Sequence, residues 1–254
     1  MNEIKDYAGY NKAMSKSLLD KVWWLDKIPP IINTIIDFGC ADGAMFAFIH
    51  KMFPNRFHFI GVDNNDEMLR QTHYKALRYG YKVQLFSSVE NIPPALVENA
   101  VLVMNSVCHE ILNYTTYWEG DALFSQIKNL GAKYIAIRDM YEHDNPCFTH
   151  LLPCEEINNW MKSTIATPHK DLQTGLLEYM LKADYKNNWD REVEERYLWK
   201  WGHWFWRMEN YETICEEDFM LPYHRRVWRK RYHIPLADLR KIRTHKKMLL
   251  HLTK

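Results

Sequence analysis

The stretch that decides the fold runs from Thr34 to Leu69 and reads TIIDFGCADGAMFAFIHKMFPNRFHFIGVDNNDEML. It opens on an apolar run that leads into a turn containing Gly39 and Gly43. Apolar residues at helical spacing follow from Ala44, and a second apolar run ends on Asp63. This order predicts a βαβ unit in which two buried parallel strands flank a glycine-bearing turn and a helix.

The residue types in this unit indicate the kind of ligand that it binds. Gly39 and Gly43 lack a Cβ, so the turn can adopt positive φ and a ligand can approach its backbone N–H groups. Asp63 lies about 20 to 25 residues beyond the glycines, at the end of the second strand, where a carboxylate can accept hydrogen bonds from both ribose hydroxyls. The unit therefore predicts an adenosyl-type ligand.

The spacing of the glycines separates two classes of such ligands. The dinucleotide fingerprint is Gly-x-Gly-x-x-Gly, which places a pyrophosphate at the helix N-terminus. Here Ala41 occupies the middle position, and Met45 stands near the place of the last glycine. This turn is therefore poorly suited to binding a pyrophosphate.

The turn instead resembles motif I of the class I S-adenosylmethionine (SAM)-dependent methyltransferases. That motif is an acid-x-Gly-x-Gly/Ala-x-Gly pattern, present here as Asp37-Phe38-Gly39-Cys40-Ala41-Asp42-Gly43. The resemblance implies a methyltransferase that binds SAM through the turn positions Asp37, Gly39, Ala41 and Gly43. It also implies that Asp63 is the ribose-binding acid of motif II.

Strands and helices continue to alternate after this unit, which predicts an α/β fold. Further helices are expected at 7–25, 65–79, 117–130 and 219–232, and further strands at 81–86, 100–104, 134–137, 211–215 and 246–252. The resemblance implies that these strands complete a Rossmann-like, seven-stranded methyltransferase sheet in which strand 7 is antiparallel.

The resemblance also places further cofactor contacts downstream. Asn64, one residue past the ribose acid, is expected beside the adenine. Ser87 and Ser88 follow the third strand, where the family usually places a polar or acidic group near the adenine amine, so serine is a departure. Asn105, at the end of the fourth strand, is expected on the methionine side.

The pair His109-Glu110 follows the fourth strand, and an open α/β sheet places its active site at the carboxyl ends of its strands. Methyl transfer from a sulfonium needs a positioned, deprotonated acceptor, and the protein often supplies one base. A histidine, with an ordinary pKa of about 6.5, suits that role, and Glu110 can orient it or bind an amine acceptor. Alternatively, the His109 ring is bonded to the backbone and has no catalytic role. Arg138-Asp139, expected at the tip of the fifth strand, can hold a charged substrate or form internal pairs, and internal pairing is favoured.

A metal site is not expected. His143, Cys147, His150 and Cys154 are spaced as ligands on one helix face would be. Two prolines interrupt that helix, however, and no CxxC or HxxxH pattern supports the site.

The chain is predicted to have three segments. Residues 1–143 form the N-terminal helix and the SAM-binding core, residues 144–206 a helical cap, and residues 207–254 the closing strands with a basic C-terminal segment. The sequence WKWGHWFWR stands at Trp199–Arg207, at the end of the cap. Its tryptophans are expected either to stack on a planar or cationic acceptor or to fill the core of the cap.

Two features bear on the acceptor. Arg225–Lys247 is rich in arginine and lysine, and these charges would attract phosphates if they cluster in space. The sequence after the fourth strand lacks the Asn/Asp-Pro-Pro-Tyr turn of amino-methylating nucleic-acid enzymes, and no catechol-type metal-binding acid triad can be placed. A small-molecule acceptor is therefore favoured, the alternatives being a nucleic-acid (RNA or DNA) methyltransferase and a SAM-binding protein without methyl transfer.

Composition bounds the cellular setting. The formal net charge of +1 gives no overall attraction to polyanions. The five cysteines are scattered and odd in number, which argues against a disulfide framework and favours a reducing cytoplasm. No apolar signal core and no run of about 18 apolar residues occurs, so neither secretion nor membrane association is expected.

Overall fold

A computed structural model of the chain describes residues 17–108, 110–111, 115–140 and 208–253. The chain divides into two compact units, one made of residues 1–139, 202–216 and 247–254, the other of residues 140–201 and 217–246. The division into three segments at residues 143 and 206, which the sequence suggests, remains a prediction. The predicted Trp-rich cap at 144–206 lies outside the described residues.

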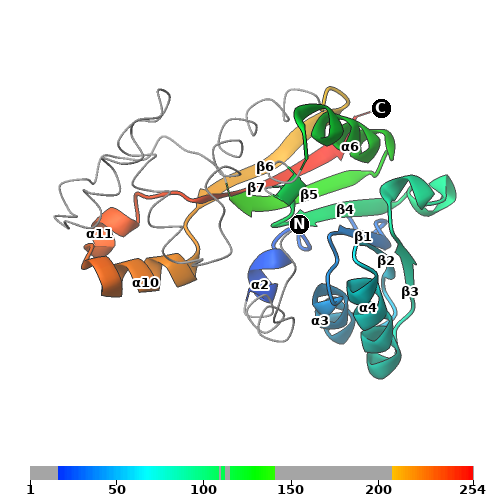
Figure 1. The fold of residues 1–254 in the computed structure, drawn as a ribbon, viewed down its shortest axis with the longest axis horizontal. Helices are drawn as coiled ribbons and strands as arrows, with labels where there is room; N and C mark the ends of the chain where they lie inside the picture. The colour runs from blue at the N-terminus through cyan, green and yellow to red at the C-terminus, as the bar shows by residue number, and fades with distance from the viewer. Residues whose placement is uncertain (1–16, 109, 112–114, 141–207, 254) are drawn as a thin grey trace. The chain divides into compact units, whose positions relative to one another are not determined.

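The described strands form a seven-stranded sheet with the order β3-β2-β1-β4-β5-β7-β6 (Figure 1). They are β1 (Thr34–Phe38), β2 (His58–Val62), β3 (Val83–Phe86), β4 (Ala100–Asn105), β5 (Tyr134–Met140), β6 (Tyr211–Phe219) and β7 (His245–Leu252). The strands from β1 to β5 pair in parallel, and β7 is antiparallel. The predicted α/β fold with a seven-stranded sheet is confirmed.

The described helices connect these strands. They are α2 (Leu18–Lys21), α3 (Ala44–Met52), α4 (Asp66–Tyr79), the short 3₁₀ helices η1 (Val89–Asn91) and η2 (Pro94–Leu96), α6 (Tyr117–Asn129), α10 (Pro222–Tyr232) and α11 (Leu236–Leu239). Helix α4 packs on β2 and β3, and α3 packs against both α4 and α2 (Figure 1). No helix among the described residues is long and apolar enough to cross a membrane.

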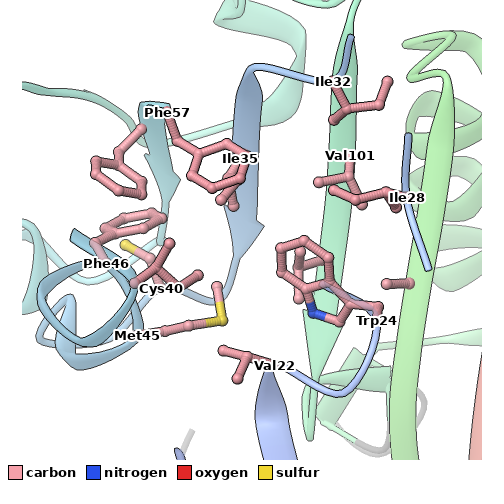
Figure 2. Packing of buried hydrophobic residues seen from close by; sticks show 14 of the residues in the cluster. Val22, Trp24, Ile28, Ile32, Ile35, Cys40, Met45, Phe46, Phe57 and Val101 are labelled. Atoms are coloured by element: carbon pink, nitrogen blue, oxygen red, sulfur yellow. The ribbon is translucent and has the colours of Figure 1, made fainter. Parts of the chain in front are cut away.

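The core of the first unit is built around β1 and β4, whose residues are almost all buried. Continuous apolar runs suit such strands because helices cover parallel sheets on both faces. Figure 2 shows Trp24, Ile35, Phe46 and Val101 within one apolar cluster. Each of these four side chains has 0% of its surface exposed, so this cluster anchors β1 and β4, the strands that lead to the site.

Part of the predicted N-terminal helix is replaced by turns. Among the described residues of 7–25, only Leu18–Lys21 is α-helical, and turns follow from Val22. The backbone hydrogen bonds there span three residues in place of the four of an α-helix. They run from the Leu25 N–H to the Val22 carbonyl and from the Lys27 N–H to the Trp24 carbonyl, both at 3.0 Å. These turns coincide with the burial of the Trp24 side chain.

Two strands are longer than the sequence predicts. β5 continues to Met140, so Arg138 and Asp139 lie within the strand and not at its tip. β6 continues past Cys215 to Phe219 through a run of acidic residues. β6 is the last strand of the sheet, and an edge strand can expose charged side chains.

Helix α10, in the second unit, has cap residues that explain its bounds. Pro222 occupies its first turn, where no N–H is needed. His233 ends it in the left-handed conformation, with φ of 54°. Trp228 is fully buried in this unit.

Candidate functional site

A pocket lies at the carboxyl ends of β1, β2 and β4. Residues predicted to bind or act there are brought together in its lining, namely Asp37, Gly39, Ala41, Asp63, Asn64, Asn105 and Glu110. The ends of parallel strands are the usual ligand site of an open α/β sheet. All these residues belong to the first unit.

The turn after β1 forms one wall of the pocket. Its first N–H groups, from Gly39 and Cys40, both donate to the Val62 carbonyl, at 2.8 and 3.0 Å. Gly39 has φ of 76°, and a Cβ at this position would lie 2.9 Å from Cγ2 of Val107. Glycine is therefore required by both the conformation and the close approach of Val107.

Gly43 closes the turn and is the N-cap of α3, with φ of 70°. A Cβ there would lie 2.7 Å from Cγ2 of Thr72, whose hydroxyl donates to the Ala41 carbonyl at 2.7 Å. Gly43 does not itself line the pocket, but it lets Thr72 pack closely against the turn that does.

Gly43→Ala should lower the free energy of unfolding by about 2 to 4 kcal/mol, because left-handed backbone strain adds to a clash with Thr72. Gly80→Ala is the matched control, since Gly80 has φ of 74° but nothing within 4 Å of the added Cβ. The control should cost only about 1 to 2 kcal/mol. Urea unfolding measures both, and equal losses would contradict the role given to Thr72.

Asp63 stands just beyond β2 with its carboxylate fixed by the backbone. Its Oδ2 accepts from the Ala41 N–H at 2.9 Å, and its Oδ1 accepts from the Asn65 N–H at 3.0 Å. Burial raises the pKa of Asp63, and these two bonds act in the opposite direction. Each oxygen accepts one bond here and has capacity for another, so the carboxylate can receive two hydroxyls.

Two buried titratable side chains also belong to the lining. Asp37 is 5% exposed and Lys21 is 9% exposed. Burial raises the pKa of Asp37 well above its usual range, against the effect of the Lys21 charge. Burial, together with the charge of Arg138, lowers the pKa of Lys21 to about 8.

Asn105, the last residue of β4, also lines the pocket. Its Nδ2 donates to the Lys21 carbonyl at 3.2 Å and contacts Sδ of Met45 at 3.4 Å. Its Oδ1 is buried and has no hydrogen-bond partner within the part of the chain that the structure describes. A buried unpaired acceptor is costly, and in a pocket it is a feature that a ligand donor can satisfy.

The network around Arg138 supports the same end of the sheet. The guanidinium donates from Nε to Oδ2 of Asp20 at 2.6 Å and from Nη1 to Oγ of Ser106 at 3.1 Å. Lys247 pairs with the other oxygen of Asp20 at 2.7 Å. Arg138 thus forms internal pairs, as predicted, and Asp20 is the partner that the sequence pattern could not identify.

No protein-family model matches this sequence, and no curated protein matches it. Among solved structures, the PH0226 protein of Pyrococcus horikoshii OT3 is 11% identical, with 98% of this chain and 96% of that chain covered and a TM-score of 0.57. The methyltransferase domain of bacterial CtHen1-C is 12% identical, with 95% and 99% covered and a TM-score of 0.51. This chain has the class I methyltransferase fold.

Some residues predicted from the methyltransferase pattern lie elsewhere. Ser87 and Ser88 follow β3 but do not line the pocket, and the Ser88 hydroxyl accepts from the Glu90 N–H at 3.4 Å as the cap of η1. His109 lies outside the described residues, as does the group of histidines and cysteines at 143–154. Glu110 is exposed and lines the pocket.

Sequence reasoning missed other residues that line this pocket. They are Leu18, Lys21, Cys40, Ala44, Met45, Asn65, Met68, Ser106 and Val107. A signal was present for the first two, because Leu18 and Lys21 are three residues apart and therefore share a helix face. For Ser106 and Val107 the signal was their place between Asn105 and Glu110, at the end of the fourth strand.

Proposed function

We propose that this chain is a SAM-dependent methyltransferase that binds SAM in the pocket at the ends of β1, β2 and β4. The observation that carries the proposal is the Asp63 carboxylate, held by the Ala41 and Asn65 N–H groups in the lining. Such a carboxylate can accept both hydroxyls of a ribose. When bound, SAM supplies an electrophilic methyl group on its sulfonium.

The lining fits SAM in further respects. The turn from Gly39 to Gly43 lets a ligand approach the backbone, and Asn64 is exposed at the rim, where we place the adenine. The unpartnered Oδ1 of Asn105 suits the ammonium of the methionine end. We give Asp37, which is buried in the lining, the same end of the cofactor.

We propose a base role for His109 because of its position just after β4. Glu110, which lines the pocket, then orients that histidine or binds an amine acceptor. The base would take a proton from the acceptor as the methyl group is transferred.

A small-molecule acceptor is favoured over a nucleic acid by the charges in the second unit. Lys241 pairs with Asp238 at 3.1 Å, and Lys246 pairs with Asp218 at 3.5 Å. The Arg243 guanidinium donates to the carbonyls of Arg240 and Ile242. The two ion pairs offset part of the positive charge that a phosphate backbone would need, and the hydrogen bonds hold the Arg243 guanidinium against its own backbone.

Cofactor binding and turnover test the proposal. SAM at 100 times its dissociation constant should stabilise the protein by about 2.7 kcal/mol, measured as a thermal shift. Incubation with candidate acceptors should release S-adenosylhomocysteine (SAH). A protein that ignores SAM in calorimetry but binds a nicotinamide nucleotide would contradict the assignment, and SAM binding without SAH formation from any acceptor would favour a non-transferring SAM-binding protein.

A further inference from the structure

Lys21 lines the pocket, although only 9% of its surface is exposed. Burying an ammonium is costly unless it is paired. Among the described residues, its Nζ forms no hydrogen bond and no ion pair, whereas the neighbouring Lys247 and Arg138 both pair with Asp20. The charges of Asp37, Asp42 and Asp20 act on this ammonium without a direct contact, so a ligand carboxylate in the pocket can serve as its hydrogen-bonded partner.

The backbone of Lys21 is held more firmly than a helix end usually is. Its carbonyl accepts from Nε1 of Trp24 at 3.1 Å and from Nδ2 of Asn105 at 3.2 Å. The second of these bonds also orients the Asn105 amide, because a carbonyl can only accept and Nδ2 must therefore face it. The same contact thus positions a cationic donor, Lys21, beside an unpartnered acceptor, Oδ1 of Asn105.

Resting on the proposed function, we propose that Lys21 binds the α-carboxylate of the cofactor and makes the pocket selective for ligands that carry an intact amino-acid end. An ammonium for the carboxylate and an amide oxygen for the amine match the two charges of an α-amino acid. A charge-assisted hydrogen bond in a site shielded from water is about twice as strong as a neutral one. Adenosyl compounds without the carboxylate should consequently bind weakly.

Calorimetry with three probes tests this selectivity. They are SAH, S-adenosyl-3-thiopropylamine, which lacks only the carboxylate, and 5′-methylthioadenosine, which lacks the whole amino-acid end. Wild type should bind SAH about 10 to 100 times more tightly than the thiopropylamine. Lys21→Met should lose that factor for SAH while its affinity for 5′-methylthioadenosine stays unchanged.

Two controls keep the outcomes separate. Lys51→Met removes a lysine from the exposed face of α3, outside the pocket lining, and should bind all three probes as wild type does. Lys21→Met replaces a buried ammonium by an apolar chain of similar length, and circular dichroism with thermal unfolding checks that the variant is folded at the temperature of the calorimetry. Equal weakening for all three probes would mean that Lys21 only packs, and unchanged SAH binding would overturn its contact with the carboxylate. If wild type binds none of the probes, the proposed function fails and this inference fails with it.

Discussion

Asp63→Ala should weaken SAM and SAH binding by at least about 100-fold, because two charge-assisted hydrogen bonds to the ribose are lost, each worth about 1.5 to 3 kcal/mol. The variant also releases the Ala41 N–H, so the turn after β1 loses the contact that links it to the end of β2. Calorimetry measures the affinity, and circular dichroism checks that the fold persists.

The controls for Asp63→Ala separate the ribose contact from charge and from folding. Asp66→Ala removes an exposed carboxylate three residues later, in the first turn of α4 and outside the pocket lining, and should bind SAM as wild type does. Asp63→Asn keeps one acceptor oxygen and should give an intermediate loss. Wild-type affinity in Asp63→Ala would remove the main support for an adenosyl ligand.

The βαβ unit could be predicted because its signals are local. Continuous apolar runs identify β1 and β4 as strands buried on both faces, and glycine is the residue that tolerates the left-handed turn between β1 and α3. Asp63 could be predicted as a site residue for the same reason, since its distance from the turn follows from the length of one helix and one strand.

The parts that could not be predicted depend on contacts distant in sequence. Arg138 was expected at a strand tip because a charge usually ends an apolar run, yet it lies inside β5, paired with a residue 118 positions away. A buried arginine is tolerated only when such a partner exists, and no local pattern reveals the partner. Lys21 escaped prediction in the same way, because its helix ends where Asn105 and Trp24 share its carbonyl.

Trp24→Ala should lower the free energy of unfolding by about 3 to 5 kcal/mol, because a fully buried indole is removed and a cavity remains. Trp24 is 0% exposed and packs in the cluster with Val22, Ile28 and Val101 (Figure 2). Its indole N–H also donates to the Lys21 carbonyl, so SAH affinity should fall in the same variant as Lys21 loses its position.

Two substitutions separate these effects of Trp24. Trp24→Phe keeps most of the ring but has no N–H donor, so it should lose about 1 kcal/mol for the hydrogen bond besides a smaller packing loss, and it should still weaken SAH binding. Trp23→Ala changes the adjacent, half-buried tryptophan, whose Nε1 has no hydrogen-bond partner among the described residues, and should cost less than Trp24→Ala. Urea unfolding followed by circular dichroism gives the stabilities. A Trp24→Ala protein as stable as wild type would show that the cluster closes without the indole, whereas unchanged SAH affinity in Trp24→Phe would show that Asn105 alone holds the Lys21 backbone in place.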